Sequence, residues 1–284
     1  MSFQHFYYLT AYFLLYSFLG WCLEVAYHAV SKGVIVNRGF LNGPVCPIYG
    51  VGMVCVLTIL DPLRRHTVLL YICGTIFATL IELVGGFVLY KLFRMRWWDY
   101  SKEPFNLGGF ICAKFSLAWG VCILFAVKMV HPFVELNVSL MDRPLGYAFV
   151  IICYTLFVAD CIITVLTIAK LNTKLHRLNN LAVKMRGFSD ELTEKIGEKS
   201  LEAGVHVQEG QVQAALGQAE AREEFERIRE QIIRHRHFSY GRMLRAFPNA
   251  SHSLYTDEFA NAIATMKSRR AEFLEARARR KARI

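Results

Sequence analysis

Long apolar runs recur along the first 170 residues, and no other feature limits the possible folds as strongly. A hydrocarbon core of about 30 Å requires about 20 apolar residues in a helix that rises ~1.5 Å per residue. Runs of this kind are centred on residues 6–30, 44–60, 67–90, 108–130 and 144–169. We therefore predict an all-α fold, a polytopic helical membrane bundle with about five transmembrane helices.

The second run is the weakest of these predicted spans. It is short, and it opens on the irregular sequence Pro44-Val45-Cys46-Pro47. Non-helical backbone at membrane depth is tolerated only where it is buried in protein or lines a cavity. A re-entrant or half-buried segment is therefore the alternative to a full second span.

Composition and charge divide the chain into two parts. Hydrophobic residues make up 54% of the chain and charged residues only 20%, against about 45–50% and ~25% in soluble domains. Most of the 33 Lys and Arg residues follow residue 170. This excludes a disordered chain, a disulfide-stapled secreted module and an ordinary soluble enzyme. We predict a transmembrane helical domain over residues 1–170 and a charged, helical, cytoplasmic C-terminal region over residues 171–284.

The distribution of basic residues predicts the orientation in the membrane. With five spans, one side receives Lys32, Arg38, Lys91, Arg94, Arg96, Lys102, Lys170, Lys174 and Arg177, and the other only Arg64, Arg65 and Arg143. Cytoplasmic loops carry the excess of Lys and Arg. We expect a multi-pass protein of the cytoplasmic (cell) membrane with its N-terminus outside and its C-terminus in the cytoplasm. The first run lacks the basic region and cleavage site of a removable signal peptide, so it should remain in the mature protein.

Two loops rich in Gly, Pro, Asn and aromatic residues follow the first and third runs. Such residues build ordered irregular backbone, because Asn and Asp bond to their own main chain and Gly accepts positive φ. On the predicted topology both loops face the same side. They form either one polar vestibule at the inner mouth of the bundle or two well-capped helix connectors. The candidate residues are Asn37, Arg38, Asn42, Cys46 and Tyr49 in the first loop, and Trp98, Asp99, Tyr100 and Asn106 in the second.

Among the ionisable residues of the predicted spans, four are candidates: Glu24, Glu82, Lys114 and Asp160. Each costs a few kcal/mol unless it is paired or hydrated, so each is a functional candidate. Glu24 and Lys114 lie at comparable depth, which predicts a buried ion pair. Three carboxylates against one lysine fit a proton- or cation-coupled pathway, a cationic group on a ligand, or a structural polar network. For Asp160 we favour the structural role.

The cysteines and the known nucleotide motifs predict no cofactor. The eight cysteines occur singly and match no zinc spacing, so we predict no metal site and only Cys46, beside two prolines, as chemically special. The chain contains no G-x-x-x-x-G-K-[ST] loop for a nucleotide. No catalytic constellation is recognisable, so an enzyme is the less favoured class.

The tail carries helical patterns and a basic end. Leu171, Leu175, Leu178, Leu181 and Met185 predict an amphipathic helix continuing from the last span. The pattern of residues 219–236 predicts a second helix. One hypothesis is that the protein forms a homo-oligomer through this helix. For the basic final twenty residues we favour a solvated, frayed tail. Binding to anionic membrane lipid headgroups is the alternative, and nucleic acid is the poorer one, because the basic residues lack interleaved aromatics.

Several motifs together resemble one family, the ABC-transporter type IV (CmpB-like) bacterial membrane proteins. The motifs are Gly20-Trp21 with Glu24, residues 37–44, residues 46–50, residues 98–101, residues 104–107, Ile111-Cys112, Phe115-Ser116, Trp119-Gly120 and residues 245–249. They run nearly from end to end of the chain. The resemblance implies a permease component of an ATP-driven transporter, with any ATPase a separate cytoplasmic subunit.

Three functions remain open on this evidence. The first is a permease-type subunit that moves a solute or lipid, with Glu24, Glu82 and Lys114 lining the path. The second is a non-catalytic membrane scaffold or partner subunit whose tail recruits another protein. The third is a membrane-embedded enzyme acting on a lipid, with Asp99, Glu24 and Tyr49 as acid–base groups and Arg38 holding an anionic headgroup.

Overall fold

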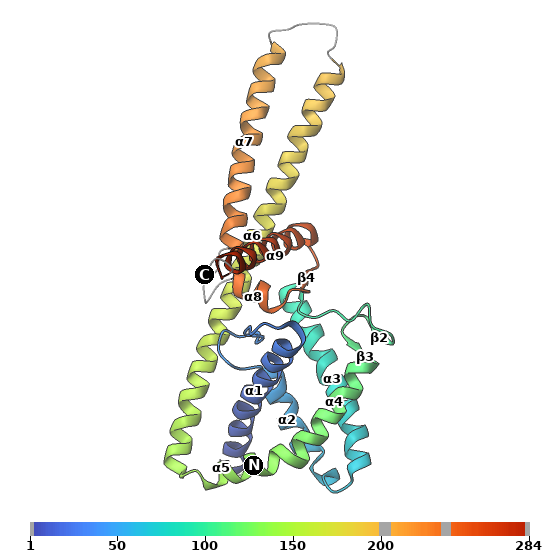
Figure 1. Ribbon diagram of the computed structural model, residues 1–284, viewed down its shortest axis with the longest axis vertical. Coiled ribbons are helices and arrows are strands. Elements are labelled where there is room, and N and C mark those ends of the chain that lie inside the picture. The colour runs from blue at the N-terminus through green and yellow to red at the C-terminus, as the bar shows by residue number, and fades with distance from the viewer. Residues whose placement is uncertain (1–2, 199–205, 234–239, 282–284) are drawn as a thin grey trace. The chain divides into compact units, whose positions relative to one another are not determined.

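The computed structural model describes residues 3–198, 206–233 and 240–281, and the chain there is almost entirely helical (Figure 1). The helices are α1 (Phe3–Lys32), α2 (Pro47–Ile59), α3 (Thr67–Phe93), α4 (Ala113–Phe125), α5 (His131–Leu140), α6 (Arg143–Glu198), α7 (His206–Ile233), α8 (Tyr240–Ala246) and α9 (Thr256–Lys281). Short turns η1 (Asp61–Leu63) and η2 (Ala126–Val130, a π-helical turn) join some of them. The two-residue strands are β1 (Met95–Arg96), β2 (Asn106–Leu107), β3 (Ile111–Cys112) and β4 (Ser251–His252).

Several of these helices have the length and composition of membrane spans, which confirms the predicted helical membrane bundle. Within the described residues they are the stretches Gln4–Ser31, Thr67–Phe93, Ala113–Leu140 and Arg143–Gly187. The second predicted span differs, because α2 has only 13 residues, or about 20 Å of helix. Its length fits the re-entrant alternative better than a complete crossing of a 30 Å core.

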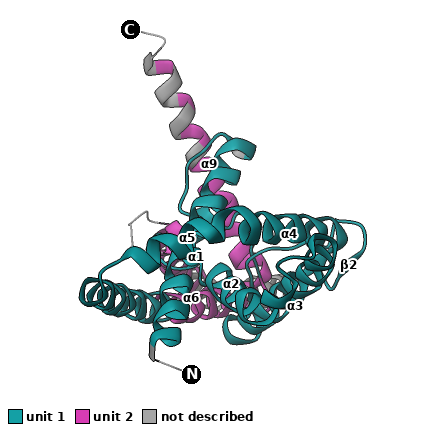
Figure 2. Cartoon of the chain, turned by 90° about the horizontal axis from the view of Figure 1, so that it is seen from below, with its two compact units in different colours: residues 1–166, 243–251 teal, residues 167–242, 252–284 magenta. Residues whose placement is uncertain are grey.

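The chain divides into two compact units, shown in Figure 2. The first comprises residues 1–166 together with residues 243–251, and the second comprises residues 167–242 and 252–284. In the first unit, α1 packs against α2 and α3 packs against α4. A short piece of the tail, residues 243–251, therefore belongs with the helices of the first unit.

Two glycines allow the helices of each pair to approach closely. In α2, a Cβ atom at Gly50 would lie 2.5 Å from the carbonyl oxygen of Phe13 and would collide with the hydroxyl of Ser17. In α4, a Cβ atom at Gly120 would collide with the hydroxyl of Thr75 and lie 3.1 Å from the Cβ of that residue. Small residues of this kind at the contact are typical of membrane helices, where close packing drives association.

The α1–α2 and α3–α4 pairs repeat one pattern of residues, which sequence inspection did not reveal. In each pair, two residues four positions apart contact the glycine, Phe13 and Ser17 in α1 and Tyr71 and Thr75 in α3. In each, a glutamate follows seven positions later, Glu24 in α1 and Glu82 in α3. The return helix in each pair begins after a buried, extended cysteine N-cap, Cys46 in one and Cys112 in the other. We refer to residues 3–59 and 67–125 as the first and second repeats.

The second unit has its own apolar core. Ile168, Leu171, Leu175 and Leu178 of α6 are at most 1% exposed, while Leu181 and Met185 are half-buried. The predicted amphipathic stripe is therefore buried most fully at its start. On α7, Ile228 and Ile232 are buried as well. Residues 234–236 of the predicted 219–236 helix lie outside the described residues, and association through this helix stays a prediction.

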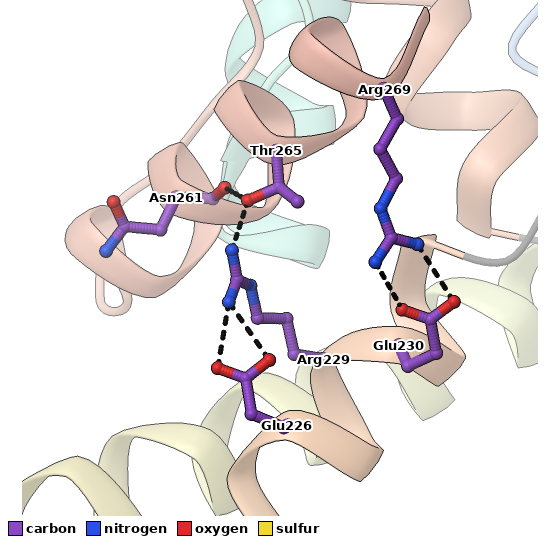
Figure 3. Close-up of polar contacts among 6 residues, drawn as sticks. All are labelled: Glu226, Arg229, Glu230, Asn261, Thr265 and Arg269. Carbon is purple, nitrogen blue, oxygen red and sulfur yellow. Dashed lines mark hydrogen bonds and ion pairs between the residues drawn. The ribbon is translucent and has the colours of Figure 1, made fainter. Parts of the chain in front are cut away.

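Polar contacts connect α7 and α9 within this unit (Figure 3). Arg269 of α9 forms a two-pronged ion pair with Glu230 of α7, at 2.8 and 2.9 Å. Arg229 bonds to Glu226 on its own helix and to Thr265 on α9. Exposed pairs contribute ~0–1 kcal/mol each. They therefore determine the register of the two helices more than their stability.

His252 begins the turn that leads into α9, and its ring is only 2% exposed. Its Nδ1 accepts hydrogen bonds from the backbone N–H groups of Leu254 and Tyr255, at 3.2 and 3.1 Å. Its Nε2 lies 3.3 Å from Oδ1 of Asn172. This arrangement requires the neutral tautomer with the proton on Nε2. Burial lowers the pKa of His252 from 6.5 to about 4.

We expect the second unit to lose stability as the pH falls from 6.5 towards 4. In that window the unfolded chain binds a proton at His252 that the folded chain does not, so stability rises with pH. The full effect, about 3 kcal/mol, is present above pH 6.5 and lost near pH 4. Hydrogen exchange of residues 254–263, corrected for intrinsic rates, measures it. His252→Asn keeps a hydrogen-bond acceptor for the turn but has no group that titrates in this pH range. An equally steep pH dependence of stability in that variant would contradict the assignment of the effect to His252.

Candidate functional site

The first polar loop, residues 33–46, lies alongside α1 instead of leaving its end. The backbone N–H of Cys46 donates to the carbonyl oxygen of Ser17 at 2.8 Å, so α2 begins beside the middle of α1. About 20 Å of α1 follows Ser17, and the loop accompanies that length. Non-helical backbone therefore lies at the same membrane depth as part of helix α1. Such backbone requires surrounding protein or water.

Asn37 and Asp160 hold this loop in place. Asn37 Oδ1 accepts from the indole N–H of Trp21 at 2.7 Å and from the N–H of Gly39 at 2.9 Å. Asp160 of α6 accepts from the backbone N–H of Asn42 at 3.2 Å, from its side-chain amide at 2.9 Å and from the N–H of Gly43 at 2.7 Å. These contacts agree with the structural role favoured for Asp160.

The second polar loop, residues 94–112, is folded by its own side chains. Asp99 accepts two hydrogen bonds from Ser101, and these hold the pKa of Asp99 below its ordinary value. Asn106 donates to the carbonyl of Glu103 at 2.8 Å, and Trp98 donates to the carbonyl of Phe110 at 2.9 Å. Gly109 has φ +74°, which favours glycine. Three of the four candidates in this loop, Trp98, Asp99 and Asn106, therefore shape its backbone.

The two loops contact each other and the tail segment 243–251. The rings of Phe40 and Trp97 meet edge to face at 5.1 Å, and Trp97 meets Phe247 in the same way at 5.0 Å. Arg38 lies with its guanidinium 5.2 Å from the Phe247 ring and donates to the carbonyl oxygen of Ala246. The two loops therefore contact each other, as the predicted vestibule requires. The participation of residues 243–251 was not predicted, because no periodicity connects them to the loops.

Beneath the loops, two glutamates lie among tyrosines and a tryptophan. The hydroxyl of Tyr49 donates to Glu24 Oε1 at 2.7 Å, and the hydroxyl of Tyr100 donates to Glu82 Oε1 at 3.0 Å. Trp119 contacts the Tyr49 ring edge to face at 5.6 Å and also interacts with the Glu82 carboxylate. We call these five residues the carboxylate cluster.

The two glutamates differ in their charge partners. Arg38 Nε lies 3.7 Å from Glu24 Oε2, so Glu24 has a cation beside it. Glu82 is 8% exposed, and its Oε2 is buried without a hydrogen-bond partner among the described residues. Burial raises the pKa of Tyr100 well above its ordinary value, so this hydroxyl remains a donor.

Two sequence-based expectations change. The predicted Glu24–Lys114 ion pair is wrong: Lys114 is 65% exposed and lies 3.5 Å from Glu103, because the second loop folds back over the start of α4. Cys46 is buried as the N-cap of α2. Its thiol therefore lacks the exposure that a reactive cysteine requires.

Sequence reasoning named Trp119 only within a family motif and did not assign it to the site. The available signal was the parallel between Tyr49-Gly50 and Trp119-Gly120, an aromatic residue followed by the glycine of the helix contact. Arg38 was named, but its ion pair with Glu24 was not predicted. That pair depends on the loop returning along α1, which local sequence does not indicate.

Comparison with known proteins identifies the family. The family model described as "Putative ABC-transporter type IV" matches residues 11–165, more than half of the chain. That range includes both loops and the carboxylate cluster but stops short of residues 245–249, so the tail part of the resemblance lies outside the match. No curated protein and no solved structure matches. With its apolar helices, the chain is a membrane protein related to transport, and it belongs to the ABC-transporter type IV family.

Proposed function

We propose that the protein is a permease-type subunit that moves a solute or lipid across the bacterial cytoplasmic membrane. The observation that carries this proposal is Glu82, a buried carboxylate with one unpartnered oxygen, placed in a span beneath two polar loops. An ionisable residue in a membrane span is costly and marks substrate or ion pathways. The carboxylate cluster then lies on the path, and the loops form its inner mouth.

The orientation follows from the basic residues near the loops. Figure 1 shows the ends of α1 and α3 and the start of the loops at the same end of the first unit. That end carries Lys32, Arg38, Lys91, Arg94, Arg96, Lys102 and Lys114, whereas the opposite ends of the helices carry Arg64, Arg65, Lys128 and Arg143. By the positive-inside rule, this distribution supports a cytoplasmic location for the loops and for the tail that follows α6. A nucleotide-driven version of this function needs a separate ATPase subunit, because this chain contains no phosphate-binding loop motif.

We expect Glu82→Gln to abolish transport while the protein still folds and reaches the membrane. Glutamine keeps the size and the hydrogen bond from Tyr100 but removes the ionisable group. The measurement is untargeted mass spectrometry of the solutes and lipids of host cells that lack the gene, complemented with wild-type or variant protein at equal membrane levels. Species that change on deletion and are restored by wild-type protein form the readout.

Glu103→Gln is the matched control. Glu103 lies in the second loop and pairs with the exposed Lys114, and such a pair contributes little. It should complement as well as the wild-type protein does. Full complementation by Glu82→Gln would refute the proposal that this carboxylate lies on the transport path.

A further inference from the structure

We propose that Glu82 is a proton-binding site: its carboxylate takes one proton from water and returns it to water, while Glu24 is paired with Arg38. The use of this proton in transport rests on the proposed function above. The binding of the proton itself is tested without transport.

The repeat makes the two glutamates a natural comparison. Each lies seven residues after the hydroxyl residue that meets the glycine of the return helix, Ser17 before Glu24 and Thr75 before Glu82. Each carboxylate also accepts one tyrosine hydroxyl through Oε1. The two glutamates therefore share their position in the fold and their neutral hydrogen-bond donor.

The repeats differ in their arginines. In the first repeat the guanidinium of Arg38 lies beside Glu24. In the second loop Arg96 donates to the carbonyl of Gly108 at 2.9 Å and lies 4.7 Å over the ring of Phe110. Across the part of the chain that the structure describes, Glu82 forms no ion pair with a Lys, Arg or His nitrogen within 4.0 Å.

Burial without a cation favours the neutral acid. An ionised carboxylate removed from water costs several kcal/mol unless a counter-ion and hydrogen bonds compensate for the loss of hydration. Glu82 accepts a hydrogen bond from Tyr100 and interacts with Trp119, and its Oε2 is buried without a hydrogen-bond partner among the described residues. Adding a proton removes the charge without requiring space, which suits a carboxylate that is 8% exposed among aromatic side chains.

The groups that face Glu82 act in two directions: burial and Glu24 favour the neutral acid, whereas the donors Tyr100 and Trp119 favour the carboxylate, and burial has the largest effect. From α1 the negative charge of Glu24 acts on it, and two like charges at one site favour protonation of one of them. Tyr49 of α2 bonds to Glu24, Tyr100 comes from the second loop, and Trp119 comes from α4. Of these groups, Glu24 alone is an acid with a cation beside it, Arg38. Because Arg38 stabilises the charge on Glu24, the proton goes to Glu82.

Infrared spectroscopy of the full-length protein in lipid nanodiscs tests this assignment. A protonated carboxylic acid has a C=O stretching band separate from that of a carboxylate, and the band shifts on transfer to D₂O. At pH 7 we expect one such acid in the wild-type protein. Glu82→Gln should lose the band completely, and Glu24→Gln, the matched variant in the other repeat, should keep it. Glu82→Asp keeps an ionisable acid and should give a displaced band.

Arg38→Gln provides the converse test. Without the guanidinium, Glu24 loses its counter-ion and competes with Glu82 for the proton, so we expect the acid band to change in position or intensity relative to the wild-type protein. Absence of the band in wild-type protein, its persistence in Glu82→Gln, or its loss in Glu24→Gln would each overturn the proposal. If the wild-type protein shows the band but Glu82→Gln still complements in cells, the proton site stands and only the transport proposal is refuted. If Glu82→Gln fails to complement but the wild-type protein shows no band, only the proton site is refuted.

Discussion

Gly50→Ala is expected to destabilise the first unit by about 3 kcal/mol, enough to prevent recovery of most of the folded protein. The new Cβ atom would lie 2.5 Å from the carbonyl oxygen of Phe13, a backbone atom held by helix α1. No rotamer change relieves such a contact, so α2 must move away from α1 by about half an ångström or more. The hydrogen bonds from Cys46 to Ser17 and from Tyr49 to Glu24 cross this interface and would weaken with it.

Thermal unfolding in detergent and the yield of monodisperse protein measure this effect. Gly52→Ala is the control, since it lies two residues further along the same helix, where a Cβ atom meets only Ile81 at an ordinary 3.8 Å. That change should be neutral or stabilise by up to about 1 kcal/mol, because alanine is the better helix former. Gly120→Ala should fall between them, because the hydroxyl of Thr75 can rotate away. Equal melting temperatures for Gly50→Ala and Gly52→Ala would contradict the close packing of α1 and α2.

Asp160→Asn is expected to release the first polar loop from α6 and to destabilise the protein by about 3 kcal/mol. Asp160 accepts three hydrogen bonds from Asn42 and Gly43, all from N–H donors. Asparagine replaces one acceptor oxygen with an NH₂ group, which faces those donors and leaves at least one buried N–H unsatisfied. Limited proteolysis of residues 37–46 and thermal unfolding in detergent report the release.

Asp61→Asn is the corresponding control, because Asp61 is an exposed acid in the η1 turn. It should leave both measurements within ~0.5 kcal/mol of the wild-type protein. An Asp160→Asn variant that behaves like Asp61→Asn would show that Asp160 does not hold the loop.

The membrane bundle was predictable because apolar length is a local property of the chain. The runs at 67–90 and 144–169 correspond to α3 and to the start of α6, and a helix in lipid must be long and apolar whatever its neighbours. The run at 44–60 was less informative. A short apolar segment does not show whether it begins at the membrane surface or beside the middle of another helix, and only the contact of Cys46 with Ser17 decides this.

The sequence allowed us to predict which residues belong to the candidate site, but not which of them contact one another. Glu24, Glu82, Tyr49 and Tyr100 were recognisable because buried carboxylates are costly and motif loops are unusual in composition. Their pairing was not, since a charge at a given depth has several possible partners. Lys114 appeared suitable for Glu24 by depth alone, but a side chain also needs the right face of its helix, and Arg38 reaches Glu24 from a loop instead.

The amino-acid sequence alone therefore determined that this chain is a multi-helix membrane protein with acids in its spans and two ordered polar loops, because these properties follow from hydropathy and local backbone chemistry. The tertiary structure decided which carboxylate has a counter-ion, that two helix pairs repeat one contact pattern, and that residues 243–251 join the loops. Those outcomes depend on contacts between residues tens to hundreds of positions apart. Such contacts form only when the whole bundle has packed.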